Sequence, residues 1–62
     1  MHIGFIGAGK MAEAMLAGLI NRQFAQPRDI LAADVSGERL DALRSQYGIG
    51  VTTVNAEAVD HA

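Results

Sequence analysis

The sequence predicts an α/β fold in which parallel strands alternate with helices. Two short apolar runs, at residues 3–6 and 30–33, have the length and composition of buried strands, and a run rich in β-branched residues at 51–54 is typical of a third. The segments between them carry apolar residues at helical spacing. A glycine-rich turn joins the first run to the first helical segment, as in a β-α-β unit. The predicted element order is therefore β-α-β-α-β-α.

The first strand is expected over residues 2–6, and the apolar run within it is typical of a strand buried on both faces. The turn that follows has the form G-x-G-x-x-A, with small residues at Gly7, Gly9 and Ala12. Gly7 permits a tight turn, Gly9 lets backbone amides approach a phosphate, and Ala12 lets the helix pack close to the strand. The turn thus predicts a dinucleotide pyrophosphate site at a helix N-terminus. Its alternative interpretation is an ordinary strand-to-helix turn.

The first helix is expected to end near Asn21. Its predicted core face consists of Ala12, Met15, Leu16, Leu19 and Ile20. We interpret Met11 and Met15 as core residues, and Met11 is also near enough to the turn to touch a bound cofactor. Lys10, in the first turn of the helix, either contacts a phosphate or points into water. A polar connection containing Pro27 leads to the second strand.

The second strand stops at Asp34. An acidic residue at this position of a dinucleotide-binding unit bonds the adenosine ribose, and we expect this role for Asp34. The alternative is a turn in which Asp34 bonds its own backbone. Ser36 is expected to cap the next helix, and Glu38 suits the positive end of that helix. This helix should cover one face of the sheet and end at Gly48. Its apolar face carries Leu40, Leu43 and Tyr47.

The third strand is expected over residues 51–54, which are rich in β-branched side chains. Asn55 follows it and is expected to cap a last helical stretch, to contact a cofactor, or to do both. That stretch contains Ala58, Val59 and Ala62.

Composition excludes several classes of function. A net charge of -2 with scattered basic residues argues against a nucleic-acid partner. No apolar run approaches the roughly 20 residues that cross a bilayer, and no basic segment precedes the first apolar residues, so we expect a cytoplasmic location without a membrane partner. With no cysteine, thiolate chemistry and cysteine-bound zinc are excluded. His2 and His61 lie too far apart in the chain to show metal-ligand spacing, so we assign no catalytic or metal-binding residue.

This element order is that of one half of a Rossmann-type, doubly wound parallel sheet. In the complete fold the first strand is central, with a neighbour on each side. Here the second neighbour is missing, which would leave the first strand as an exposed edge. We therefore expect residues 1–62 to be the N-terminal part of a dinucleotide-binding domain in a larger enzyme, and we expect the isolated chain to self-associate.

With these motifs in place, the whole chain resembles the N-terminus of the pyrroline-5-carboxylate reductase family. The resemblance rests on the opening IGFIGAG-x-MA, Gly18, the Ser36-x-x-Arg39-Leu40 segment, Tyr47-Gly48-Ile49, and Val54-Asn55-Ala56-Glu57-Ala58-Val59. It implies reduction of the C=N bond of 1-pyrroline-5-carboxylate to proline by hydride transfer from NADPH or NADH. It also implies a helical C-terminal domain that forms a dimer and much of the substrate site.

The resemblance also implies a set of cofactor-binding residues, in which the turn lines the pyrophosphate, Asp34 meets the ribose and Asn55 lies beside the adenine half. The full set is Ile6, Gly7, Ala8, Gly9, Lys10, Met11, Ala12, Asp34, Ser36, Arg39 and Asn55. Lys10 departs from the Asn or Gln of many relatives. Asp34 favours NADH, because a carboxylate repels a 2′-phosphate, whereas Arg39 can reach that phosphate and keep NADPH usable.

Two alternatives to this function remain open at the level of the sequence. One is the cofactor domain of another oxidoreductase, of the β-hydroxyacid or deazaflavin-dependent type. The other is a nucleotide-binding module without enzymatic activity, because a fold does not fix a function.

Overall fold

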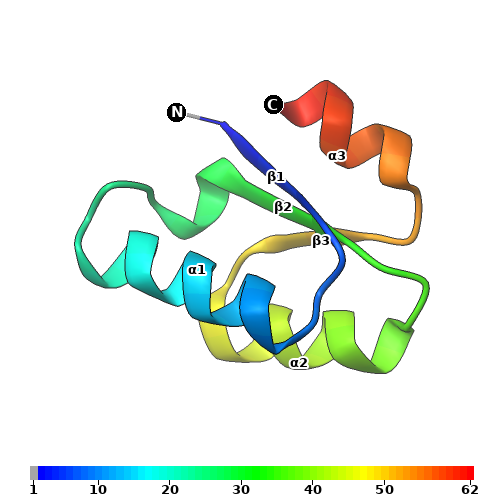
Figure 1. The fold of residues 1–62 in the computed structure, drawn as a ribbon, viewed down its shortest axis with the longest axis horizontal. Coiled ribbons are helices and arrows are strands. Elements are labelled where there is room, and N and C mark those ends of the chain that lie inside the picture. Colours follow the sequence, from blue (N-terminus) through cyan, green and yellow to red (C-terminus); the bar gives the residue numbers. More distant parts are fainter. Residues whose placement is uncertain (1) are drawn as a thin grey trace.

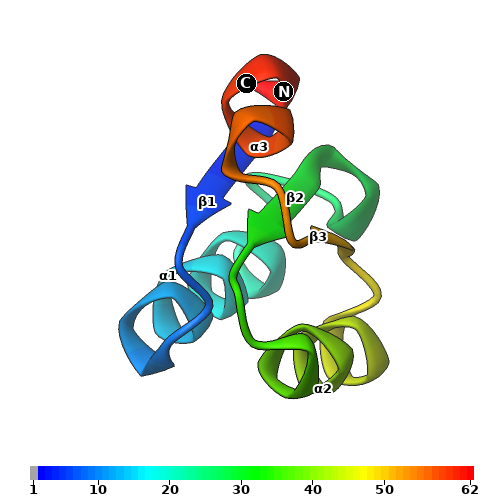
Figure 2. The same ribbon diagram turned by 90° about the vertical axis from the view of Figure 1, so that its right-hand side faces the viewer.

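The computed structural model describes residues 2–62, and its elements follow the predicted order (Figure 1). They are β1 (Ile3–Ile6), α1 (Lys10–Asn21), the short 3-10 helix η1 (Pro27–Asp29), β2 (Ile30–Ala33), α2 (Gly37–Tyr47), β3 (Gly50–Thr52) and α3 (Asn55–His61). The strands form one parallel sheet in the order β1-β2-β3. Helices α1 and α2 cover one face of this sheet, and α3 covers the other (Figure 2). The predicted Rossmann-type half is confirmed.

The core lies mainly between the sheet and the pair α1 and α2. Its buried members are Ala8, Leu16, Ala25, Ile30, Ala32, Leu40, Leu43 and Ile49. The central strand β2 is the most deeply buried, with Ile30, Ala32 and Ala33 almost fully inaccessible to solvent. This is expected of a parallel strand that has a neighbour on each side and helices on both faces.

Helix α2 begins and ends as its sequence predicts. The Ser36 hydroxyl accepts a hydrogen bond from the Arg39 amide at 3.3 Å, which satisfies one free donor of the first turn. At the other end, Gly48 adopts φ 73°, and its amide bonds the Arg44 carbonyl at 2.9 Å. A residue without a side chain is favoured there because the left-handed conformation strains other residues.

Helix α3 packs unusually close to β1. A Cβ atom on Gly4 would collide with the carbonyl group of Ala58 and would lie 2.9 Å from its carbonyl carbon. Ala58 is fully buried at this contact. Gly4 therefore allows the helix backbone to reach the strand, a role that sequence reasoning did not assign to it.

Two expectations about where these elements begin and end are wrong. The third strand spans Gly50–Thr52 rather than residues 51–54. Val54, not Asn55, is the cap residue of α3, and no side chain caps this helix. The Val54 amide instead donates to Thr52 Oγ1 at 3.1 Å, which holds the turn before the helix.

The predicted core role of two methionines is also wrong, because Met11 and Met15 are 79% and 55% exposed. The buried residue of α1 is Leu16, and Leu19 and Ile20 pack partly against the core. Ile6, at the end of β1, is 60% exposed as well. The physical reason is that β1 is the predicted edge strand, so the side of α1 above its open edge has no sheet beneath it.

Candidate functional site

The turn after β1 needs glycine at its first position. Gly7 has φ 96°, a conformation that residues with a Cβ atom rarely adopt. Its amide donates to the Ala33 carbonyl at 2.7 Å, which ties the turn to the end of β2. The strand thus leaves the sheet sharply and delivers the chain to the start of α1.

Gly9 is a glycine for a different reason. Its φ of -76° is accessible to any residue, and a Cβ atom placed on it would meet nothing within 4 Å. The fold itself therefore leaves room for a side chain at this position. That open space lies directly at the N-terminus of α1, where a bound phosphate group would come close to the backbone. This observation fits the predicted pyrophosphate site.

The start of α1 supplies free hydrogen-bond donors to this space. The first amides of any helix have no partner within the helix. Within residues 2–62, no hydrogen bond is formed by the amides of Gly9, Lys10 and Met11. The helix dipole adds partial positive charge at the same point, so the arrangement is suited to an anion. Lys10 itself is exposed, and its predicted phosphate contact stays a prediction.

Asp34 lies against this turn and is held by two backbone amides. Its Oδ2 accepts from the Ala8 amide at 2.7 Å, and its Oδ1 accepts from the Ser36 amide at 3.0 Å. The hydrogen bond from the Ser36 amide, and next that from the Ala8 amide, lower the pKa of Asp34 below its ordinary 3.8. The alternative interpretation, a turn in which Asp34 bonds nearby backbone, matches the bond from the Ser36 amide. Its contact with a ribose stays a prediction.

Arg39 reaches the same turn from the first part of α2. Its Nη1 donates to the Ala8 carbonyl at 3.5 Å, and its charge also favours the ionised form of Asp34. The structure therefore brings together Ala8 from the turn after β1, Asp34 and Ser36 from the loop after β2, and Arg39 from α2. Asn55 follows β3 at the same edge of the sheet, but no described contact joins it to the turn.

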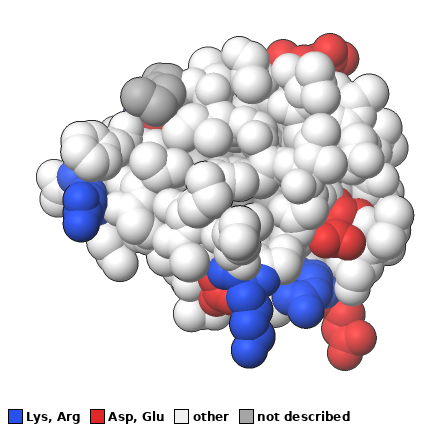
Figure 3. All heavy atoms as spheres, viewed as in Figure 1, with Lys and Arg blue, Asp and Glu red and all other residues white. Residues whose placement is uncertain are grey.

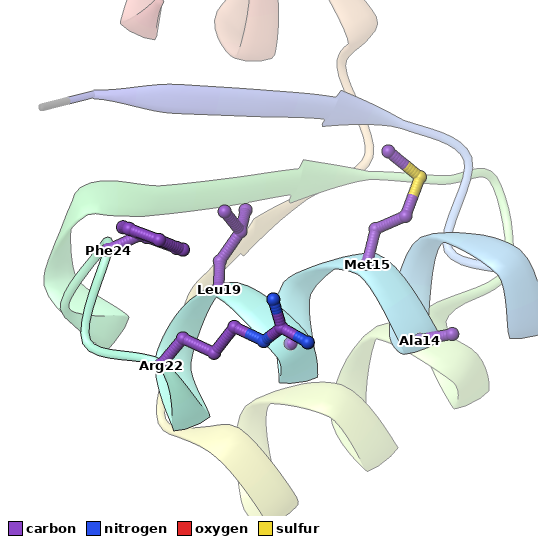
Figure 4. Close-up of a pocket in the computed structure, with 6 residues that line it drawn as sticks. Ala14, Met15, Leu19, Arg22 and Phe24 are labelled. Atoms are coloured by element: carbon purple, nitrogen blue, oxygen red, sulfur yellow. The ribbon is translucent and has the colours of Figure 1, made fainter.

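Two apolar hollows flank α1 on the side of the open β1 edge. One adjoins the turn and is lined by Phe5, Ile6, Gly7, Gly9, Met11, Ala12 and Met15. The other runs along the outer flank of the helix, lined by Ala14, Met15, Gly18, Leu19, Arg22 and Phe24 (Figure 4). Only the first hollow contains residues predicted to bind a cofactor.

Acidic and basic side chains are interspersed on the face shown in Figure 3, where no extended basic area is seen. The helices of residues 2–62 are all too short or too polar to cross a membrane.

The two histidines meet at the opposite end of the sheet, which their spacing in the chain did not predict. The rings of His2 and His61 pack edge to face with centroids 4.9 Å apart, and His61 Nε2 lies 2.9 Å from the Asp29 carbonyl oxygen. No third ligand joins them, because the described residues contain no group of three His, Cys, Asp or Glu side chains able to hold a metal. The pair joins α3 to the segment before β2.

Comparison with known proteins agrees with this geometry. Residues 2–62 match the protein family described as "NADP oxidoreductase coenzyme F420-dependent". The chain belongs to this family. It is also 46% identical over 57 residues to the pyrroline-5-carboxylate reductase of Methanosarcina acetivorans, covering 92% of this chain and 21% of that protein. For the enzyme of Synechocystis sp. the identity is 38% over 60 residues, covering 97% and 22%.

Pyrroline-5-carboxylate reductase 2 of Bacillus subtilis is 42% identical over 48 residues, which cover 76% of this chain and 17% of that protein. The resemblance read from the motifs is thereby confirmed for the cofactor-binding region. The chain spans about a fifth of the length of the curated relatives it matches most fully.

Proposed function

We propose that this chain supplies the NAD(P)H-binding part of an enzyme that reduces 1-pyrroline-5-carboxylate to proline. The observation that supports this most strongly is its similarity, over nearly its whole length, to reductases named for that substrate. The geometry of the turn is consistent with it, because the open space at Gly9 and the free amides of α1 suit a pyrophosphate.

In this proposal the pyrophosphate lies over the segment from Gly7 to Met11, and Ile6 and Ala12 border it. Asp34 bonds the adenosine ribose through lone pairs that the two amides leave free. Ser36 and Arg39 face the ribose 2′ position, and Asn55 lies near the adenine half. No residue of this chain is assigned a catalytic role.

The bound nicotinamide would supply a hydride for the imine carbon, while the imine nitrogen gains a proton. The part played by this chain is binding and orientation, which is the usual contribution of a protein to cofactor chemistry. The absence of a recognised acid-base pair among the predicted site residues is consistent with that division of work. Substrate contacts and assembly into an oligomer are assigned to the helical domain implied by the resemblance.

The direct test is an assay of the full-length protein for oxidation of NADPH and NADH that depends on 1-pyrroline-5-carboxylate. We expect turnover with this imine and none with β-hydroxyacids or their keto forms. Turnover of a β-hydroxyacid with no reaction of the imine would contradict the proposal. Binding of ATP in preference to both nicotinamide cofactors would contradict it as well.

A second candidate is an NADP-linked reaction with a deazaflavin, because the matched family is described in those words. The same preparation would be tested for reduction of coenzyme F420 by NADPH. Activity with the deazaflavin alone would replace the first candidate. Activity with the imine alone would exclude the second.

A further inference from the structure

The hydrogen bonds around Ala8 give Asp34 a task that involves no ribose. One carboxylate oxygen of Asp34 accepts the Ala8 amide at 2.7 Å, and the other accepts the Ser36 amide at 3.0 Å. Both partners are backbone groups of the protein. The carboxylate therefore connects the turn after β1 to the start of α2, even without a ligand.

The carbonyl group of Ala8 is held as well, by a side chain from the helix that follows β2. Arg39 Nη1 donates to the Ala8 carbonyl at 3.5 Å, and Ala8 as a whole is 2% exposed. The peptide groups before and after Ala8 are thus both oriented by the segment that follows β2. The contact from Arg39 is long, at 3.5 Å, so Asp34 provides the stronger of the two constraints.

This arrangement decides which amides remain available to an anion. The Gly7 amide bonds the Ala33 carbonyl, and the Ala8 amide bonds Asp34. With the Ala8 peptide fixed in this way, the next amides along the chain, at the start of α1, keep a set orientation beside the open space at Gly9. If the Ala8 peptide were free to rotate, the turn would lose this orientation.

We propose that Asp34 is a positioning residue for the phosphate-binding turn, fixing the Ala8 peptide so that the first amides of α1 face the pyrophosphate. The identity of the anion rests on the proposed function, but the contacts with Ala8 and Ser36 do not. A carboxylate is suited to this task because it accepts at both oxygens. An Asn side chain accepts at one oxygen only and would turn an NH2 group toward the second amide.

The first experiment measures residue-resolved amide hydrogen exchange in the unliganded protein. In Asp34→Ser the Ala8 amide should exchange about tenfold faster than in the parent, because its hydrogen bond is lost. The matched control is Asp41→Ser, which removes an exposed carboxylate whose described partner is the Arg44 side chain at 3.4 Å. Exchange at Ala8 in that control should stay within about twofold of the parent. Unchanged exchange at Ala8 in Asp34→Ser would overturn the proposal.

A second measurement uses the parent protein and does not depend on how a variant folds. The amide proton shifts of Ala8 and Ser36 should titrate together, with a midpoint below 3.8, because both amides bond the same carboxylate. Asp34→Asn should abolish this common titration and give intermediate exchange at Ala8. Separate midpoints, or no titration at Ala8, would overturn the proposal.

The functional test uses inorganic pyrophosphate, which has no ribose, as a competitor of NADH. Loss of positioning predicts that Asp34→Ser binds pyrophosphate several-fold more weakly, although removing a negative charge would by itself strengthen anion binding. Stronger binding would show that Asp34 acts by charge and ribose contact alone, and would overturn the proposal. Failure of the parent to bind any dinucleotide would instead refute the proposed function, and the exchange and titration results would still stand.

Discussion

Gly4 and Gly9 belong to the same strand-turn-helix segment, but their surroundings differ. At Gly4 the backbone of α3 fills the space that a side chain would need. At Gly9 nothing in the protein comes within 4 Å of the point that a Cβ atom would occupy. The two glycines therefore have different roles. Gly4 permits close packing within the fold, and Gly9 leaves an open surface for a ligand.

The two regions also differ in the interactions that hold them. The contact of β1 with α3 is formed by close approach of backbones around the buried Ala58. The turn is held by the hydrogen bond that the Ala8 amide donates to Asp34 and by the one that Arg39 donates to the Ala8 carbonyl. Stability should consequently depend most on the first region, and ligand affinity on the second.

The largest expected effect is on folding, through Gly4→Ala. The added methyl group collides with the Ala58 carbonyl, which is backbone and cannot turn away, so we expect a loss of about 3 kcal/mol in the free energy of unfolding. Denaturant titration of both proteins measures it. Gly18→Ala is the control, because a Cβ at Gly18 meets nothing within 4 Å. Equal stability of Gly4→Ala and the parent would contradict the close approach.

Gly9→Val tests the open region. The branched side chain blocks approach of the cofactor phosphates, so we expect the dissociation constant for NADPH and NADH to rise about 100-fold. Stability should change little, because the side chain enters open space. Gly18→Val, placed farther along the same helix, is the control and should retain binding. A folded Gly9→Val variant with parental affinity would show that the pyrophosphate does not lie over this turn.

The preference between NADPH and NADH separates the roles of the two side chains, Asp34 and Arg39, that hold the turn. Asp34→Ser should shift the ratio of kcat/KM toward NADPH by about tenfold, since a carboxylate repels a 2′-phosphate. Arg39→Ala should shift the ratio toward NADH by about the same factor, because a charge-assisted contact is lost. The parent should use NADH at least as well as typical relatives do. Unchanged ratios in both variants would show that neither side chain reads the 2′ position.

The smallest expected effect is a pH dependence of stability. The folded-state pKa of Asp34 lies below its ordinary 3.8, so its ionised form stabilises the fold above that value. This contribution is lost as the pH falls through the folded-state pKa. The difference in melting temperature between the parent and Asp34→Asn should therefore shrink between neutral pH and pH values below 3.8. A difference that is constant over this range would contradict the lowered pKa.

The features that could be predicted from the sequence are those set by local chemistry. The glycine turn, the Ser36 cap and the Gly48 helix end each depend on neighbours within a few positions, and each is found where expected. Gly4 was missed because its role depends on which distant helix crosses the strand. The exposure of Met11 was missed because helical spacing does not reveal where the sheet ends beneath the helix.

The same division applies to the candidate site. The sequence shows that an acidic residue, Asp34, ends the second strand. Its bond to Ala8 joins residues 26 positions apart, so only the structure could reveal it. Asn55 was expected to cap α3, yet the helix begins one residue earlier than that role requires, with Val54 as its cap residue. The meeting of His2 and His61 likewise arises only when α3 folds back over the start of the sheet.

The left-handed turn at Gly48 has a consequence for chirality. Its φ of 73° and ψ of 20° are close to the mirror image of an ordinary right-handed helical residue. A D-alanine introduced at this position by chemical synthesis would adopt that conformation without strain. It would also restrict the unfolded chain more than glycine does, which typically stabilises a fold by about 0.4–1 kcal/mol. At the end of α2 the backbone thus favours a D-amino acid, whereas the residues within the helix favour L-amino acids.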